Sequence, residues 1–370
     1  MGFKCGIVGL PNVGKSTIFN ALTAGSGAHA EAANYPFCTI NPNVGIVKVP
    51  DPRLGEIAKR ITPQSLIPAT MTFVDIAGLV KGASKGEGLG NQFLGHIREV
   101  NAIAHVVRCF ENENIVHVDG KVNPERDIST IDTELILSDL EAVTKRFNGI
   151  EKQARMGDKK SAAVLGVLQR VKDTLERGLN ARSLKLNEEE LLTIYDFHLL
   201  TVKPVLYCAN LDEKGMQNPE ANEHYQAVVK HAKTEGARVV AICGALEAEI
   251  AALSSDEERV EFLKEMGLSE TGLARLIRTG YELLGLITYF TAGEKEVRAW
   301  TLRKHSKAPQ AAGVIHSDFE RGFIRAECYH YDDLIKCGSE QAVKDQGKLR
   351  VEGKEYVVQD GDILHFRFNV

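Results

Sequence analysis

Apolar residues near the amino terminus follow a strand, loop and helix pattern. Residues 4–8 form a short apolar run, and Ile18, Phe19 and Leu22 then fall on one side of a helix predicted over residues 16–23. Further apolar runs, typical of buried strands, cover residues 71–74, 104–109, 204–209 and 238–243. Because strands and helices alternate, the pattern predicts an α/β fold built on a doubly wound sheet.

The pattern changes from about residue 127. Apolar positions there step by four and three along two stretches, namely Ile136, Leu140, Val143, Phe147, Ile150 and Ala154, and then Val164, Leu168, Val171 and Leu175. The breaker Met156-Gly157-Asp158 separates the two stretches. These stripes predict two helices that pack against each other as an antiparallel coiled-coil hairpin, inserted between strands of the sheet.

The carboxyl-terminal part has short strand patterns instead. Strand-like runs cover residues 287–290, 297–302, 323–326, 356–358 and 363–368, and residues 308–321 allow a short helix. Asp360-Gly361 is a turn signal, and the whole suits a small β-grasp domain. We therefore expect three domains: residues 1–126 with 186–284, the helical insertion 127–185, and residues 285–370.

The loop between the first strand and the first helix carries a phosphate-binding motif. It runs from Gly9 to Thr17 and matches Gly-x4-Gly-Lys-Ser/Thr, in the strand and helix context that the motif requires. Its backbone N–H groups and the helix N-terminus would cradle a triphosphate. Lys15 would contact the β- and γ-phosphates, and the Ser16 hydroxyl would bind Mg²⁺. The nucleotide-binding candidates in the loop are Asn12, Val13, Gly14, Lys15, Ser16 and Thr17.

Two later segments fit the other parts of a nucleotide switch. Thr39 lies in a segment after the first helix, where a hydroxyl is needed to reach Mg²⁺. Asp75 ends an apolar strand and could hold Mg²⁺ through a water molecule, and the N–H of Gly78 could sense the γ-phosphate. We expect the glycine-rich residues 79–91 to be ordered by the ligand.

The residue that orients the attacking water in Ras-type enzymes is missing. Leu79 stands after Gly78 where those enzymes have Gln, and leucine has neither a donor nor an acceptor. Either hydrolysis is slow, or another group positions the water. His117 is one candidate for that role, although it is equally well explained as an exposed loop histidine. Asn12 is a candidate ligand for a monovalent cation such as K⁺.

The base is expected to contact Asn210-Leu211-Asp212-Glu213, at the end of a buried strand. A GTPase has Asn-Lys-x-Asp there, and its Asp accepts hydrogen bonds from guanine. Here Leu211 and Glu213 replace the Lys and the Asp. We therefore favour ATP over GTP, with adenine contacted by main-chain groups around Asn210 and Leu211 and with Glu213 pointing elsewhere.

Composition and charge narrow the class of protein. The 370 residues carry a net charge of −5, which gives no general attraction to nucleic acid or to anionic membranes. Between residues 145 and 172, however, eight basic residues stand against two acidic ones, so the hairpin end is a candidate contact for a phosphate backbone. The seven scattered cysteines suggest reduced thiols, and no apolar run is long enough to span a membrane. We expect a cytoplasmic protein without DNA specificity.

Together these motifs resemble the YchF family, the Obg-like ATPases. The resemblance covers essentially the whole chain, from the phosphate loop through Pro36-Phe37-Cys38-Thr39, residues 75–83 and residues 210–213 to the tail Tyr289-Phe290-Thr291-Ala292-Gly293. It implies a P-loop NTPase fold that prefers ATP, a coiled-coil insertion and a C-terminal TGS domain. It also implies association with the ribosome, on the large subunit or the 70S particle and through rRNA, and a role in translation or stress regulation.

Two other interpretations of the phosphate loop stay open. A small-molecule kinase would need an arginine-bearing lid, and Thr39 and Asp75 speak against it. A nucleotide-gated binding module with incidental hydrolysis is compatible with Leu79. Turnover without an acceptor separates the first from an ATPase, and acceleration by ribosomes separates the second.

Overall fold

The computed structural model describes residues 3–24, 43–78 and 89–369. Contacts divide the chain into two compact units. Met1–Ile46 and Thr72–Gly280 belong to unit 1, and Val47–Met71 and Tyr281–Val370 belong to unit 2. Over the described ranges, the structure contains no helix with the length and apolar character that crossing a bilayer requires.

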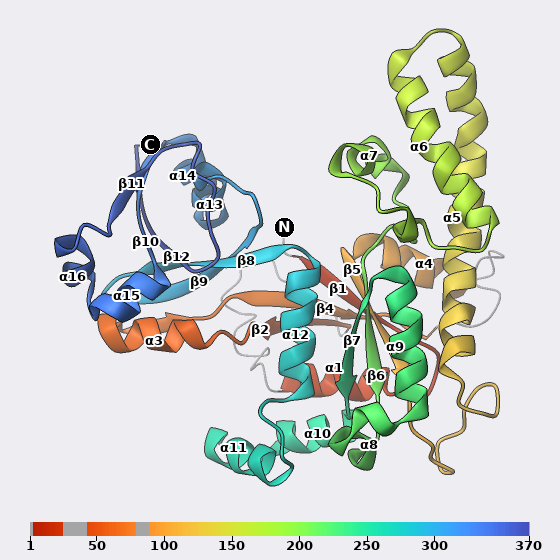
Figure 1. Cartoon of the computed structure of the whole chain (residues 1–370), viewed down its shortest axis with the longest axis horizontal. Helices are drawn as coiled ribbons and strands as arrows, with labels where there is room; N and C mark the ends of the chain where they lie inside the picture. Colours follow the sequence, from red (N-terminus) through yellow and green to blue (C-terminus); the bar gives the residue numbers. More distant parts are fainter. Residues whose placement is uncertain (1–2, 25–42, 79–88, 370) are drawn as a thin grey trace. The chain divides into compact units, whose positions relative to one another are not determined.

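A six-stranded sheet with the order β2-β4-β1-β5-β6-β7 forms the centre of the first part of the chain (Figure 1). Its strands are β1 (Lys4–Val8), β2 (Val44–Lys48), β4 (Thr70–Asp75), β5 (Ala102–Arg108), β6 (Val205–Asn210) and β7 (Arg238–Ile242). The pairs β1–β4, β1–β5, β5–β6 and β6–β7 are all parallel. The strands β5 and β6 are buried along their whole length, as expected for a parallel sheet covered by helices. The predicted doubly wound sheet is confirmed.

Helices cover this sheet (Figure 1). α1 (Lys15–Ala24) packs on β1 and on α10 (Gly244–Ala252), and α9 (Glu223–Glu235) packs on β6 and β7. The remaining helices of this region are α4 (Leu89–Glu99), α8 (Glu213–Gln217), α11 (Asp256–Glu265) and α12 (Gly272–Leu283). Each βα connection therefore brings a strand's carboxyl end and a helix N-terminus to the same edge of the sheet.

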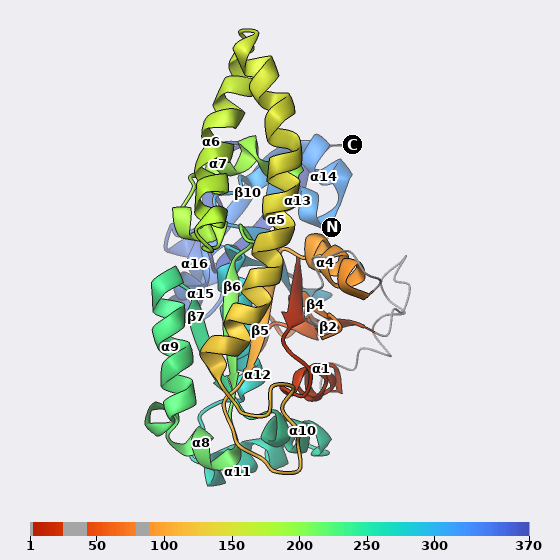
Figure 2. The same cartoon turned by 90° about the vertical axis from the view of Figure 1, so that its right-hand side faces the viewer.

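The predicted helical hairpin is present. α5 (Pro124–Arg155) and α6 (Lys159–Glu176) pack along each other, and Figure 2 shows the end of the hairpin projecting from the sheet of unit 1. The reversal uses the predicted breaker: Gly157 has φ of 92°, and the Asp158 side chain caps α6. Buried residues of the predicted stripes, among them Val143, Leu168 and Val171, form its core.

Asn187 and Glu190 form a capping box that opens α7 (Glu188–Thr193). The helix is followed by a short 3₁₀ turn, Tyr195–Phe197, and His198 has φ of 49°. A left-handed backbone conformation at that position cannot continue an α-helix.

Unit 2 contains a second six-stranded sheet, with the order β11-β10-β12-β8-β9-β3. Its strands are β3 (Ser65–Ile67), β8 (Leu286–Ala292), β9 (Glu296–Arg303), β10 (Phe323–His330), β11 (Arg350–Glu352) and β12 (Asp362–Phe368). The helices are α3 (Pro52–Ile61), α13 (Ala308–Ile315), α14 (Ser317–Arg321), α15 (Tyr331–Cys337) and α16 (Glu340–Asp345). Antiparallel and parallel pairs are mixed, because β12 pairs in parallel with β8 and β3 with β9.

One predicted strand of this unit is wrong. Residues 356–358 make only an isolated bridge, between Lys307 and Val357, and β11 is the strand that occupies the sheet edge. The other four predicted strands are present with longer bounds. The core includes Tyr289, Ala312 and Leu364, which join β8, α13 and β12. The TGS assignment of this unit stays a prediction.

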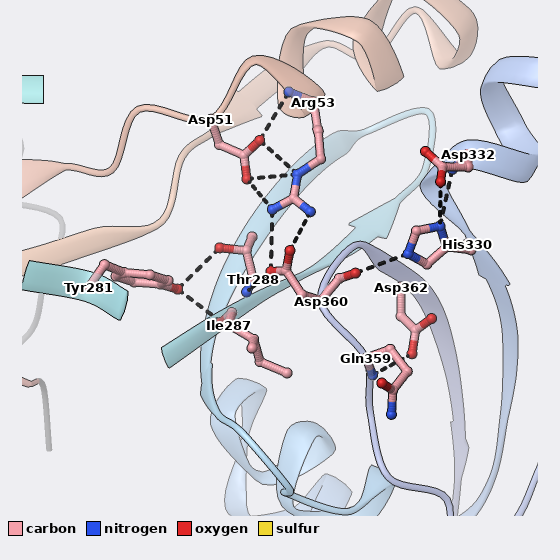
Figure 3. Close-up of polar contacts among 10 residues, drawn as sticks. All are labelled: Asp51, Arg53, Tyr281, Ile287, Thr288, His330, Asp332, Gln359, Asp360 and Asp362. Carbon is pink, nitrogen blue, oxygen red and sulfur yellow. Dashed lines mark hydrogen bonds and ion pairs between the residues drawn. The ribbon is translucent and has the colours of Figure 1, made fainter. Parts of the chain in front are cut away.

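Residues 47–71 are held in unit 2 by polar contacts around Asp360 (Figure 3). The Arg53 guanidinium donates to the carboxylates of Asp51 and Asp360, at 2.7 Å in each case for the shortest contact. Asp360 also accepts the backbone N–H of Thr288 at 2.8 Å, and Tyr281 donates to the Ile287 carbonyl at 2.9 Å. The sequence predicts residues 47–71 as part of the nucleotide-binding domain, whereas contacts group Val47–Met71 with unit 2. The three predicted domain boundaries stay predictions.

The cysteines within the described ranges are all free. Five of them are buried, and burial raises the pKa of the Cys5 thiol to about 12. Cys337 is partly exposed, and Cys38 lies outside the described residues. Buried thiols with a raised pKa are poor nucleophiles, so these cysteines act as small apolar core residues.

Candidate nucleotide-binding site

The phosphate loop connects β1 to α1, as its sequence predicts. Gly14 has φ of 97°, and a Cβ there would lie 2.2 Å from Nδ2 of Asn210. No other residue type fits this position, because both the backbone angle and the close approach exclude a side chain. Asn12 also has a positive φ, 62°, which asparagine tolerates better than most residues.

The side chain of Asn210 braces the phosphate loop. Its Nδ2 donates to the Val13 carbonyl at 2.8 Å, and its Oδ1 accepts the Gly244 N–H at 2.9 Å. The side chain is buried, and its amide group is occupied on both sides. Asn210 thus ties the loop to the start of α10, and contacts to a base would fall to main-chain groups, as the sequence analysis expected.

Lys15, Ser16 and Asp75 lie together next to this loop. Lys15 is 8% exposed, and its Nζ donates to the Leu10 carbonyl at 2.9 Å. Burial lowers the pKa of Lys15, and the negative charge of Asp75 opposes that shift. Burial likewise raises the pKa of Asp75, against the effects of Lys15 and of a hydrogen bond with the Ser16 side chain. The three side chains form one electrostatically coupled group.

These residues fit a magnesium ion. Oδ1 of Asp75 is buried and has no hydrogen-bond partner, a costly arrangement that a cation or an ordered water would relieve. A carboxylate and a hydroxyl are also the hard oxygen ligands that Mg²⁺ prefers. Thr39, the other predicted ligand, and Leu79 lie outside the described residues.

Gly78 follows β4 and lies close to the phosphate loop. A Cβ at this position would be 3.2 Å from Nζ of Lys15 and 3.5 Å from Pro11. A side chain would therefore crowd the ammonium group that the motif directs at phosphate. Gly78 therefore lies beside Lys15, and its predicted role as a γ-phosphate sensor stays a prediction.

His117 is buried in the loop between β5 and α5. Its Nε2 lies 2.9 Å from Asp127, and its Nδ1 accepts the Asp119 N–H at 3.1 Å. Both ring nitrogens are therefore occupied, and His117 does not line the pocket described below. The structure does not bring it to a position where it could hold a water molecule. Asn12 does reach this loop, through Nδ2 and the Val116 carbonyl at 3.1 Å.

A pocket of about 490 Å³ opens beside the phosphate loop. It gathers the predicted residues Asn12, Gly14, Lys15, Ser16, Thr17, Asn210 and Leu211. Val13 contributes to the site only through its carbonyl, and Asp212 and Glu213 also line the pocket. We expected Glu213 to point away from the base, but it lines the pocket.

Six lining residues were missed by the sequence analysis. They are Phe110, Asn112 and Ile115 after β5, and Cys243, Gly244 and Ala245 after β7. A positional signal existed for both groups, because ligands of open parallel sheets bind at the carboxyl ends of the strands. Residue type alone gave no such signal.

The hairpin end carries a concentration of unpaired positive charge. Three of its eight basic residues pair with carboxylates, in the pairs Arg155–Glu151, Arg170–Glu190 and Lys172–Glu176. Four others, Lys145, Lys152, Lys159 and Lys160, are exposed and form no ion pair with any residue that the structure describes. Met156, at the turn between the helices, is 88% exposed. The tip therefore presents ammonium groups that are available to an anionic partner.

Family models match both ends of the chain. Residues 4–138 match a model described as 50S ribosome-binding GTPase. Residues 286–369 match the YchF GTPase carboxyl-terminal model, which is described as a protein of unknown function (DUF933). The two matches cover the phosphate loop with its following strands and nearly all of the second sheet.

Full-length relatives agree with these matches. Proteins named Ribosome-binding ATPase YchF from Haemophilus influenzae, Escherichia coli O157:H7 and Bacillus subtilis are 56%, 57% and 54% identical to this chain, over 100% of both sequences. The solved structure of the Schizosaccharomyces pombe YchF GTPase has a TM-score of 0.88 and 41% identity, and it covers 99% of this chain and 98% of its own. With these similarities over its whole length, the chain belongs to the YchF family.

Proposed function

We propose that this protein is a ribosome-associated ATPase that converts ATP to ADP and phosphate and acts as a nucleotide-dependent switch in translation or stress regulation, in the cytoplasm. The observation that carries this proposal is that Lys15 and Ser16 of the phosphate loop line the same pocket as Asn210 and Leu211. The relatives named Ribosome-binding ATPase YchF support the same conclusion.

The proposed roles of the residues follow from their positions. The amides of the phosphate loop and Lys15 bind the phosphates and stabilise the transferring phosphoryl group. Ser16 and Thr39 would hold Mg²⁺, which neutralises phosphate charge when it is bound. Asp75 would orient a water bound to that Mg²⁺, and the Gly78 N–H would couple the γ-phosphate to the segment that follows it. Asn12 is a candidate ligand for K⁺.

ATP is proposed as the preferred nucleotide. Leu211 occupies the position of the lysine that packs along guanine in GTPases, and it is 2% exposed. Asp212 is used to cap α8, where its side chain accepts the Gly215 N–H at 2.8 Å. Glu213 lines the pocket at the position of the Asp that accepts hydrogen bonds from guanine. Its side chain is one methylene longer than that of Asp, so its carboxylate does not fit the guanine edge, which favours contacts between adenine and main-chain groups.

The proposed partner is the ribosome, on the large subunit or the 70S particle. The exposed lysines of the hairpin tip fit the phosphate backbone of rRNA, since ammonium groups that neutralise phosphates release bound counterions. The partner would sense the nucleotide state through the hairpin and the carboxyl-terminal unit. No membrane partner and no DNA specificity are proposed.

Phosphate release in the presence and absence of ribosomes tests this function. Without any acceptor we expect slow turnover of Mg-ATP. We expect 70S ribosomes to raise the turnover rate about 10-fold or more, which is less than the rate acceleration that activating proteins give to GTPases. The absence of turnover, or a requirement for an acceptor, would refute an ATPase. Slow turnover that ribosomes do not accelerate would favour the nucleotide-gated binding module, which Leu79 makes a credible alternative.

A further inference from the structure

The last residue of β5, Arg108, is a buried arginine that contacts main-chain carbonyls. It is 1% exposed. Its Nε donates to the Phe110 carbonyl at 3.0 Å, Nη1 to that of Ile115 at 2.9 Å and Nη2 to that of Asn112 at 3.3 Å. The guanidinium carbon also lies 4.6 Å from the centre of the Phe110 ring. One side chain therefore bonds to three carbonyls within residues 110–115 of the loop that follows β5.

These three carbonyls belong to the three residues through which this loop lines the nucleotide pocket. We propose that Arg108 is a positioning residue for nucleotide binding: it fixes the wall formed by Phe110, Asn112 and Ile115, and through that wall it sets the discrimination between bases. The inference rests on the proposed function, because it requires a nucleotide in this pocket.

Stability alone is a weak explanation for this arginine. Burying a guanidinium is costly, and apolar residues of similar size often replace buried charges without loss of stability. Burial lowers the pKa of Arg108, with Glu111 and Asp127 opposing the shift from a distance. Among the residues that the structure describes, Arg108 has no ion-pair partner, so carbonyl dipoles solvate its charge. Its planar set of donors suits the spacing of several carbonyls in a way that lysine cannot reproduce.

Other contacts hold the rest of the loop. Asn12 bonds to Val116, His117 pairs with Asp127, and Arg126 donates to the Lys121 carbonyl. All three contacts lie beyond Ile115, in a part of the loop that does not line the pocket. The wall also has two bonds within itself, from the Ile115 and Asn114 N–H groups to Asn112, and a contact at 3.4 Å between His224 and the exposed side chain of Glu111. These are weaker restraints than three bonds to a buried guanidinium, so loss of the Arg108 side chain should loosen the pocket wall while the remainder of the loop stays in place.

The expected consequence is a change at the base end of the site. If the wall is already fixed before the nucleotide binds, less conformational entropy is lost on binding and the affinity is higher. The phosphate contacts of Lys15 and the loop amides do not involve Arg108. ATP and ADP should therefore lose affinity by the same factor, and the preference for ATP over GTP should shrink. At saturating ATP the rate of turnover should stay unchanged.

Arg108→Gln and the matched control Arg126→Gln test the inference in the full-length protein. Affinities for Mg-ATP, Mg-ADP and Mg-GTP are measured by calorimetry, and KM and kcat by phosphate release. For R108Q we expect ATP and ADP affinities to fall about 10-fold, the ATP-to-GTP preference to fall about fivefold, and KM to rise with kcat within about twofold. For R126Q all affinities should stay within about twofold of the parent.

A second variant, Arg108→Lys, keeps the proposal falsifiable if R108Q folds poorly: it retains the charge but cannot bond to three carbonyls at once, so it should shift the ATP-to-GTP preference in the same direction. Phe110→Leu alters the wall directly and should also lower this preference, and adding it to the folded Arg108 variant should give little further change. An unchanged preference in the folded Arg108 variant, or additive effects of the two substitutions, would overturn the inference. If the parent protein itself fails to bind ATP, the proposed function fails instead, and the two failures are distinct in the same titrations.

Discussion

Arg53 and Asp360 are 307 positions apart in the sequence, and their side chains form an ion pair at 2.7 Å (Figure 3). Two further contacts fix this pair, since Arg53 also bonds to Asp51 and Asp360 also accepts the Thr288 N–H. Burial disfavours the charge of Arg53, but the two carboxylates outweigh it and raise the pKa of Arg53 above its ordinary value. Asp51 and Arg53, at the start of α3, are thereby fastened to the carboxyl-terminal residues of unit 2.

Asp360→Ala should loosen residues 52–67 within unit 2. The change removes one of the two carboxylate partners of Arg53 and the acceptor of the Thr288 N–H. We expect a local cost of about 2 kcal/mol, because a lost charged partner leaves polar groups unsatisfied. Hydrogen exchange in residues 52–67 should then accelerate about 30-fold. The control Glu327→Ala breaks a similar contact with Arg367, between β10 and β12, and should leave this exchange unchanged. Unaltered exchange in D360A would show that the segment is held in place by other contacts.

The fold was predictable where local patterns decide it. The period of the hairpin stripes and the breaker at Gly157 define α5 and α6 without any tertiary information. Residues 44–67 gave no comparable signal, because β3 is only three residues long and gains its stability by pairing with β9, more than 200 residues later. Long-range pairing of this kind cannot be recognised from a local pattern, and the same limit explains the wrong strand at residues 356–358.

Asp75→Asn tests the metal-binding role. Replacing the carboxylate with an amide should weaken Mg²⁺ binding, so turnover should fall about 100-fold and ATP affinity should become insensitive to Mg²⁺. ATP affinity measured with a chelator should stay close to that of the parent, because the phosphate loop is intact. Calorimetry with and without Mg²⁺ gives both numbers. A D75N protein whose ATP affinity still depends on Mg²⁺ as in the parent would contradict the assignment.

The hairpin tip should determine the salt dependence of ribosome binding. Reversing two charges with Lys159→Glu and Lys160→Glu should weaken binding about 10-fold or more and lower the salt slope by about 2, or about 1 for each lost phosphate contact. Co-sedimentation with ribosomes over a series of salt concentrations measures this slope. Lys230→Glu with Lys233→Glu, on the exposed side of α9, is the charge-matched control. Equal effects of both pairs would point to net charge rather than to the tip.

His105 should make the protein sensitive to acid. It lies in β5 with 3% exposure, and burial, with help from the charge of Arg182, lowers the pKa of His105 to about 3. The unfolded chain therefore binds a proton below about pH 6.5 that the folded chain excludes, and stability falls as pH falls. Between about pH 6.5 and 4.5 the loss should be about 1 to 3 kcal/mol. His105→Gln should remove this part of the slope in denaturant titrations, whereas His96→Gln on the surface of α4 should retain it.

The candidate site was predictable where a motif fixes both residue type and position. The phosphate loop, Asp75 and Asn210 were found from their spacing, and the structure brings them to one edge of the sheet. The wall held by Arg108 was not found, because its function depends on main-chain carbonyls that any residue type could provide. His117 was a candidate by residue type, but its neighbour Asp127 on α5 is a hydrogen-bond partner that sequence reasoning did not consider.

Calorimetric titration of the full-length protein with Mg-ATP and Mg-GTP, repeated with Lys15→Ala, tests the central claim most directly. The account predicts that ATP binds at least about 10-fold more tightly than GTP. It also predicts that K15A lowers the ATP affinity by about 100-fold or more, since this lysine supplies the positive charge that faces the phosphates. Unchanged ATP affinity in K15A, or tighter binding of GTP than of ATP by the parent protein, would contradict it.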